Sequence, residues 1–219
     1  MPGYDALVFD NDGVLTTPTD RDVLQEAIRD AFDRVGVTAP PAEHVDALHH
    51  PTVDSLRSAA DAHGVDAGRL WEARERAAID AQLEEIRAGR KRLYDDVAAL
   101  DALEVPRAIV SNNQHETIAN IVDHFELQGY DPWIGREPTV EGVRRKKPEP
   151  YYLERAVDAI DARNPLYVGD SRVDVAAANA CGIDSAFLRR DHRRDYELPA
   201  APTHEISTLA DLNGLVAIE

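Results

Sequence analysis

Short apolar runs that stop at polar residues recur along the chain and predict the strands of a buried sheet. The first run covers residues 6–9 and ends at Asp10. Runs this short and this uniformly apolar are typical of parallel strands that are buried on both faces. Further runs of the same kind lie at residues 108–110, 133–134, 166–168 and 186–188.

Apolar residues at helical spacing lie between most of these runs. The spacing is clear over residues 152–160 and again over residues 173–180. Strands that alternate with helices along a chain form parallel sheets covered on both faces. The pattern therefore predicts an α/β fold, with a Rossmann-like parallel sheet core and helices on both faces.

The stretch from about residue 17 to about residue 90 interrupts this alternation and predicts helices only. Thr17 is a suitable N-cap, with Pro18 at the first helical position. A 3.6-residue apolar period then continues to Gly36, and prolines separate two shorter helices after it. A long helix is expected over residues 66–88.

These elements predict two domains and the place of a ligand site. We expect a core domain formed by residues 1–16 and 91–219, and an inserted all-helical cap domain formed by residues 17–90. Ligands of open parallel sheets bind beyond the carboxyl ends of the strands. The polar residues at those ends are Asp10-Asn11-Asp12, Ser111-Asn112-Asn113 and Gly169-Asp170-Ser171.

The first two polar clusters each allow a chemical and a structural interpretation. Asp10 and Asp12 repel one another unless a cation lies between them, and Mg²⁺ prefers such oxygen ligands. A turn with capping aspartates would use the same residues. Ser111 and Asn112 offer a hydroxyl, an amide and backbone N–H groups to an anion. They would equally suit an ordinary helix cap.

Two later clusters add a cation and further acids. Lys147 and its neighbour Lys146 are two of only three lysines, and the Pro-x-Pro that follows Lys147 restricts its backbone. A lysine held in this way can neutralise a phosphoryl oxygen. Asp170 can complete a metal site, and Asp174 can orient Lys147 or a metal-bound water. Alternatively, both acids only stabilise a helix N-terminus.

In this order, the clusters resemble the motifs of the haloacid dehalogenase-like (HAD) hydrolase superfamily. Within this superfamily, the sequence resembles the phosphatases that carry a helical cap after the first motif. Phosphoglycolate phosphatase and β-phosphoglucomutase are proteins of this type. The sequence departs from the family pattern at Asn11, where an apolar residue is commoner, and at Asp95-Asp96, where Pro-Gly is usual. The matching residues are 10–15, Ser111, Lys147-Pro148 and 169–174.

The resemblance implies a magnesium-dependent phosphatase that hydrolyses a small phosphomonoester. Asp10 would be the nucleophile and would become an aspartyl phosphate. Asp12 would protonate the leaving alkoxide and then act as base toward water. The Asp10 carboxylate, the Asp12 backbone carbonyl and Asp170 would hold Mg²⁺.

The same resemblance assigns the phosphoryl-binding residues and leaves other activities open. Ser111, Asn112 and Lys147 would bind the phosphoryl group, and Asp174 would support them. A phosphosugar mutase uses the same nucleophile and is the main alternative. Dehalogenases of 2-haloacids and phosphonate-cleaving relatives do not carry the acid found here at Asp12. A non-catalytic binding module would be expected to have lost one of the motif residues.

Composition and charge limit the binding partners and the cellular location that we expect for the protein. The net charge is −17, and such a negative field disfavours nucleic acid and anionic membranes as partners. It also predicts a protein adapted to high salt. No apolar run is long enough to span a membrane, and the first residues lack the features of a signal peptide. We therefore expect a cytoplasmic protein, and the resemblance implies that it is an enzyme with a small phosphorylated metabolite as its partner. The oligomeric state and the roles of His115 and Arg172 are not predicted.

Overall fold

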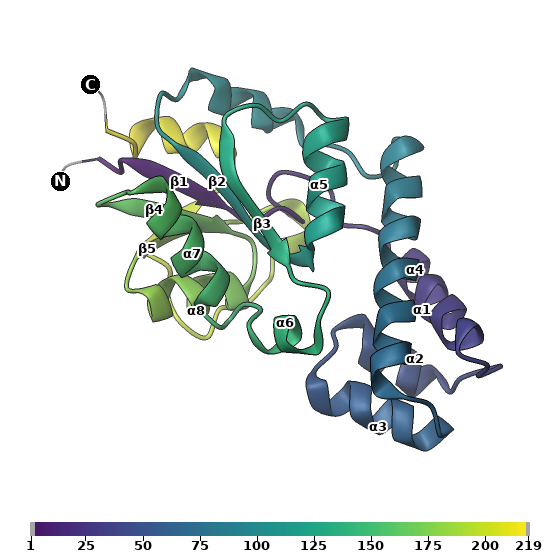
Figure 1. Ribbon diagram of the computed structural model, residues 1–219. Helices are drawn as coiled ribbons and strands as arrows, with labels where there is room; N and C mark the ends of the chain where they lie inside the picture. Colours follow the sequence, from purple (N-terminus) through teal and green to yellow (C-terminus); the bar gives the residue numbers. More distant parts are fainter. Residues whose placement is uncertain (1–2, 218–219) are drawn as a thin grey trace.

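The computed structural model describes residues 3–217 and contains one six-stranded parallel sheet (Figure 1). The strand order is β3-β2-β1-β4-β5-β6, so β1 lies near the middle and adjoins β2 and β4. The predicted α/β fold is confirmed. The strands are β1 (Ala6–Phe9), β2 (Arg107–Gln114), β3 (Tyr130–Arg136), β4 (Pro165–Gly169), β5 (Asp184–Leu188) and β6 (His204–Ile206).

Helices cover both faces of this sheet because successive strand residues point to opposite sides. Leu7 and Phe9 of β1 pack on one side, and Val8 packs on the other. The first face is covered by α5 (His115–His124) and the 3-10 helices η1 (Asp95–Ala102) and η3 (Leu209–Gly214). The second face is covered by α7 (Tyr151–Ile160) and α8 (Arg172–Cys181).

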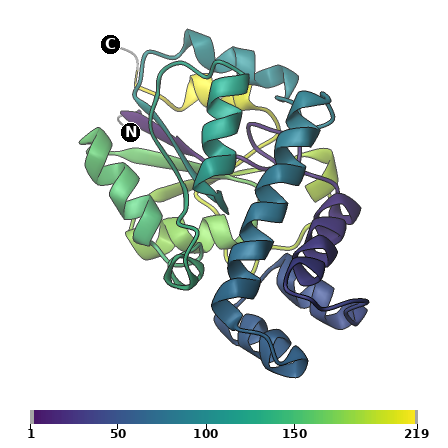
Figure 2. The ribbon, with the colours of Figure 1, turned by 45° about the vertical axis from the view of Figure 1, so that its right-hand side comes forward.

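Four α-helices lie between β1 and β2 in the described chain and form what we call the helical insertion, residues 21–87. They have their own apolar cluster, which includes Phe32, Leu56 and Leu70. Figures 1 and 2 show the insertion to one side of the sheet, with α4 beside α5. The short helix α6 (Val140–Arg144) packs Val143 against this cluster. The helices of the insertion are α1 (Arg21–Arg34), α2 (Ala42–His49), α3 (Val53–His63) and α4 (Ala67–Arg87).

The predicted start of the first helix at Thr17 is wrong. The helix α1 begins at Arg21, with Asp20 at the N-cap. The two chain segments that connect the insertion to the sheet pair with one another instead. Thr16 forms a bridge with Leu93, and the Thr17 N–H donates to the Arg92 carbonyl at 2.8 Å. This pairing keeps Thr17 extended and overrides its local preference for a helix cap.

The long predicted helix is present as α4, which has 21 residues. Asp66 is its N-cap, and the Asp66 carboxylate accepts a hydrogen bond from the Arg69 N–H at 2.9 Å. One face of α4 buries apolar residues such as Leu70 and Ile86, and charged residues occupy the exposed face. Over residues 3–217, we find no helix with both the length and the apolar character needed to cross a membrane.

Candidate active site

Three buried carboxylates meet at the carboxyl ends of the two central strands. Asp10 follows β1, Asp170 follows β4, and Asp174 lies in the first turn of α8. One carboxylate oxygen from each residue lies within 4.8 Å of the other two. Gly169 allows this approach, because a Cβ at that position would lie 2.2 Å from the Asp174 Cβ. The structure thus brings Asp10 together with two acids that lie about 160 residues later in the chain.

Lys147 is the cation of this cluster, and its side chain is almost completely buried. Its Nζ lies 2.9 Å from Asp10 Oδ1 and donates to Asp174 Oδ1 at 2.7 Å. It also donates to the Tyr167 hydroxyl at 2.6 Å and to the Val110 carbonyl at 3.1 Å. Burial alone would lower the pKa of Lys147, but its two carboxylate partners together raise it above the usual value.

Asn112 holds the backbone of this lysine. The Asn112 Nδ2 donates to the Lys147 carbonyl at 2.9 Å, and the Lys147 N–H donates to Asn112 Oδ1 at 2.7 Å. The side chain of Asn112 therefore aligns the segment that carries Lys147. Ser111 is buried beside it, and its Oγ accepts a hydrogen bond from the Asn113 N–H at 3.1 Å.

The charges of this cluster are unbalanced toward the negative side. Burial raises the pKa of the Asp10 carboxyl to about 8, Lys147 opposes this rise, and Asp174 and Asp170 add to it. A divalent cation bound here would balance the excess negative charge.

The free oxygens fit such a cation. Both oxygens of Asp174 already accept hydrogen bonds, from Lys147 and Tyr167 on one side and from Ser171 on the other. In contrast, residues 3–217 provide no hydrogen bond to Asp10 Oδ2 or Asp170 Oδ1. Two open carboxylate oxygens at neighbouring strand ends suit Mg²⁺, which binds through one or two carboxylates and keeps other positions for water and phosphate.

The Asp12 side chain lies outside the three-carboxylate cluster and is directed toward the helical insertion. Its Oδ1 accepts a hydrogen bond from Lys91, and its Oδ2 accepts one from Asn113 Nδ2 at 2.9 Å. Lys91 is fully buried and also donates to the Thr17 carbonyl at 3.0 Å. Asn113 in turn donates to Gln82 of α4 at 2.7 Å. Sequence reasoning did not identify Lys91 and Asn113 as partners of Asp12, nor Gln82 as the partner of Asn113.

A basic loop after β5 reaches the other side of the cluster. His192 Nε2 lies 2.8 Å from Asp170 Oδ2, and Arg193 Nε donates to the same oxygen at 3.0 Å. Sequence reasoning missed both residues. The available signal was the segment of residues 189–194, in which four arginines and one histidine surround a single aspartate in an otherwise acidic chain.

Arg190 of the same loop contacts Asp96, one of the two acids at which the sequence departs from the pattern of the family it resembles. Its guanidinium makes two 2.9 Å hydrogen bonds to the Asp96 carboxylate. It also donates to the Gly13 carbonyl at 3.3 Å and to the Val14 carbonyl at 2.7 Å. Asp96 further accepts the Leu209 N–H at 2.9 Å. Asp96 and Arg190 together therefore connect the turn after Asp12 to η1, to the loop after β5 and to the start of η3.

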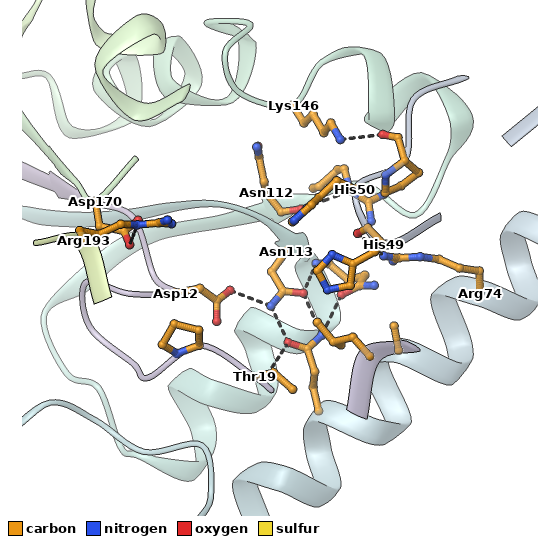
Figure 3. A pocket seen from close by; sticks show the side chains of 17 residues that line it. Asp12, Thr19, His49, His50, Arg74, Asn112, Asn113, Lys146, Asp170 and Arg193 are labelled. Atoms are coloured by element: carbon orange, nitrogen blue, oxygen red, sulfur yellow. Dashed lines mark hydrogen bonds and ion pairs between the residues drawn. The ribbon is translucent and has the colours of Figure 1, made fainter. Parts of the chain in front are cut away.

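A cavity of about 310 Å³ lies between the helical insertion and this edge of the sheet (Figure 3). The core contributes Asp12, Asn112, Lys146, Asp170 and Arg193 to its lining. The insertion and the loop after α2 contribute His49, His50, Arg74 and Gln82. A volume at the lower end of the range for ligand pockets fits a small metabolite.

Comparison with known proteins identifies the family. The model of the haloacid dehalogenase-like hydrolases matches residues 4–182, and the chain belongs to this family. An (S)-2-haloacid dehalogenase of Pseudomonas putida is 30% identical over 122 residues, which are 54% of this chain and 52% of that protein. Phosphoglycolate phosphatase 1 of Pseudomonas aeruginosa is 32% identical over 111 residues, 49% of this chain and 40% of that protein. The matched region thus spans about half of these relatives or less.

Solved structures share the fold over nearly the whole chain. CbbY from Rhodobacter sphaeroides, solved as a variant in complex with xylulose-(1,5)bisphosphate, has a TM-score of 0.71 at 16% identity. That match covers 97% of this chain and 99% of the other. A HAD-superfamily hydrolase of subfamily IA from Geobacter sulfurreducens has a TM-score of 0.60 at 19% identity. That match covers 99% of this chain and 98% of the other. At these identities, the likeness supports the fold alone.

Proposed function

We propose that the protein is a magnesium-dependent phosphatase that hydrolyses a small phosphomonoester through an aspartyl phosphate on Asp10. The observation that carries this proposal is the arrangement of open and occupied oxygens at the carboxylate cluster. Lys147 and the Asn11 N–H occupy Asp10 Oδ1, at 2.9 and 2.8 Å. Asp10 Oδ2 and Asp170 Oδ1 are left open for Mg²⁺, while Lys147 and the Asn11 N–H hold Asp10 Oδ1 in place for attack on phosphorus.

The surrounding residues have roles that follow from their contacts. Lys147 supplies a buried positive charge to a phosphoryl oxygen, and Asp174 orients Lys147. Ser111 follows Val110, whose carbonyl accepts a hydrogen bond from Lys147, and it completes the proposed phosphoryl site with a hydroxyl group. Mg²⁺ bound by Asp10, Asp170 and the Asp12 backbone carbonyl would neutralise charge on the phosphoryl oxygens.

Asp12 is the acid and base of this proposal, and the helical insertion is a cap domain. Asp12 gives a proton to the leaving alkoxide and later takes one from the attacking water. Core residues 1–16 and 91–219 hold the phosphoryl site, and residues 17–90 close over the cavity and select the rest of the substrate. The phosphoglycolate phosphatase relatives support a small phosphorylated metabolite as the substrate.

Two other activities have an observation in their favour. The dehalogenase relative favours hydrolysis of a 2-haloacid. The acid at Asp12 opposes it, because displacement of a halide needs no proton on the leaving group. The fold shared with CbbY in its sugar bisphosphate complex favours a phosphosugar mutase. A mutase would return the phosphoryl group from Asp10 to a second site on a sugar.

The test is hydrolysis of p-nitrophenyl phosphate with and without Mg²⁺, followed by a screen of phosphorylated metabolites. We expect turnover that needs Mg²⁺ and that disappears in Asp10→Asn, whose amide cannot attack phosphorus. The variant should keep the unfolding temperature of the wild type. Absence of turnover in the folded wild-type protein, at both low and molar salt, would refute the proposal.

The same preparations distinguish the alternatives. Release of chloride from 2-chloropropionate without Mg²⁺ would favour the dehalogenase. Turnover of a sugar monophosphate only when a sugar bisphosphate is added would favour the mutase.

A further inference from the structure

We infer that the wall of the cavity formed around Lys146 binds a second anionic group of the substrate, separate from the phosphoryl group that reacts. The ligand class is a short phosphomonoester with a carboxylate or a second phosphate at its other end. This inference rests on the proposed phosphatase function and specifies its substrate.

Three cationic side chains, Lys146, Arg74 and Arg136, gather at this wall, and a single carboxylate, that of Glu75, contacts two of them. Arg74 donates to Glu75 Oε1 at 2.8 Å, and Arg136 donates to both Glu75 oxygens at 2.9 and 2.8 Å. Within residues 3–217, no carboxylate forms an ion pair with Lys146. Three cations and one carboxylate leave an excess of two positive charges, in a chain whose net charge is −17.

Lys146 is the member of this group that can contact a ligand directly. Its half-buried Nζ donates to the Pro51 carbonyl at 2.7 Å, and no other partner is found for it in the described chain. Two of its three N–H donors are therefore available. Burial and the nearby Arg136 and Arg74 lower the pKa of Lys146 to about 8. A nearby anion would relieve this unfavourable setting.

The two arginines contribute electrostatic field rather than direct contacts. Besides Glu75, Arg74 donates to the Leu48 carbonyl at 3.2 Å, and Arg136 donates to the Asn112 carbonyl at 3.3 Å. The Trp71 ring lies beside both guanidinium groups, at 5.5 Å from Arg74 and 4.9 Å from Arg136. These contacts fix their positions, so the positive potential at the wall is preorganised.

The second anion site lies within reach of the phosphoryl site. Lys146 and Lys147 are consecutive, so their Cα atoms are about 3.8 Å apart. Their side chains diverge, since Lys147 contacts Asp10 and Lys146 contacts the Pro51 carbonyl in the loop after α2. Lys146, Asp12 and Asp170 line one cavity of about 310 Å³, so a small molecule can contact Lys146 with one anionic group and reach the carboxylate cluster with the other. Figure 3 shows Lys146 near His50, across the cavity from Asp170.

The test compares substrates that differ only in the second anionic group. One pair is 2-phosphoglycolate and ethyl phosphate, and the other is propane-1,3-diol bisphosphate and 3-hydroxypropyl phosphate. We expect kcat/KM of the wild type to be at least about tenfold higher for the doubly anionic member of one pair. The pair that shows the preference distinguishes a carboxylate from a phosphate ligand. A charge-assisted hydrogen bond has the strength to produce roughly a ten- to hundredfold effect.

Substitution of Lys146 should remove this preference selectively. Lys146→Met should lower kcat/KM for the doubly anionic substrate roughly ten- to hundredfold and leave the singly anionic one nearly unchanged. Lys146→Arg should keep most of the preference. The matched control is Arg144→Met, which removes an exposed cation from the same segment and should change neither substrate. Equal rates for both members of each pair in the wild type, or an equal loss for both in Lys146→Met, would overturn the inference.

A binding measurement separates this inference from the phosphatase proposal. Calorimetry with Asp10→Asn should detect tighter binding of 2-phosphoglycolate or the bisphosphate than of its singly anionic partner, and adding Lys146→Met should remove the difference. If the wild type hydrolyses no phosphomonoester but this difference is present, the phosphatase proposal fails and the anion site stands. If p-nitrophenyl phosphate is hydrolysed and the difference is absent for both pairs, only the anion site fails.

Discussion

Replacement of Lys91 by methionine should reduce catalysis in a way that depends on the leaving group. Lys91 is completely buried, and its ammonium group has only Asp12 Oδ1 and the Thr17 carbonyl as acceptors in the described chain. Methionine keeps a similar length and removes the charge. Asp12 then keeps a single side-chain partner, Asn113, so its carboxylate rotates more freely. In the proposed mechanism Asp12 protonates the leaving alkoxide, and in this variant it would spend less time in the productive orientation.

The size of the effect follows from the lost contact. A hydrogen bond to a charged group contributes about 1.5–3 kcal/mol, and 1.36 kcal/mol corresponds to a factor of ten. The Asp12 side chain is 30% exposed, so water replaces part of the lost interaction. We therefore expect kcat/KM for an alkyl phosphate to fall about 10- to 30-fold, below the ~100- to 10,000-fold that acid–base catalysis can supply in full.

The assay compares an alkyl phosphate with p-nitrophenyl phosphate. The value of kcat/KM reports transfer of the phosphoryl group to the enzyme, and p-nitrophenolate leaves without needing a proton. Lys91→Met should therefore lower kcat/KM for p-nitrophenyl phosphate less than about threefold. Arg92→Met is the matched control, because that neighbouring side chain is largely exposed. Equal losses for the two substrates would show that Lys91 only stabilises the fold.

Three further outcomes can be measured. Asp12→Asn should lower kcat for an alkyl phosphate by ~100- to 10,000-fold, and a change confined to KM would contradict its role as acid and base. Arg190→Leu should cost about 2–4 kcal/mol of unfolding free energy in urea, because it leaves the largely buried Asp96 without its ion pair. A loss below about 0.5 kcal/mol would contradict this. The net charge of −17 should make the protein more stable in molar salt than in dilute buffer, and equal unfolding temperatures would rule out that adaptation.

The sequence was sufficient to predict that the polar strand ends meet. Asp10 and Asp170 each follow a continuous apolar run, and neighbouring parallel strands place such residues at one edge of the sheet. Lys147 was also identified, because the prolines after it and the scarcity of lysines distinguish it from other basic residues. Strand β6 was not predicted, because only one of its three residues, Ile206, is apolar.

The residues that were missed depend on contacts between distant segments. Lys91 reaches Asp12 only because the two segments that connect the insertion to the sheet pair with one another. The same pairing made the N-cap prediction at Thr17 wrong. Arg193 lies on a loop whose carbonyl groups are held by Arg189, which donates to the carbonyls of residues 193, 194 and 196 at 2.9–3.1 Å. No local pattern encodes that loop conformation.

The contacts of Asp96 and Arg190 can form only late in the synthesis of the chain. Asp96 accepts hydrogen bonds from Arg190 and from the Leu209 backbone, and Arg190 holds the carbonyl groups that follow Asp12. During synthesis from the N-terminus, the turn beside Asp12 is made first but receives this support only after residue 190 has left the ribosome. A nascent chain that ends before residue 190 would carry every proposed reacting group and lack the contacts of Arg190 with the turn beside Asp12.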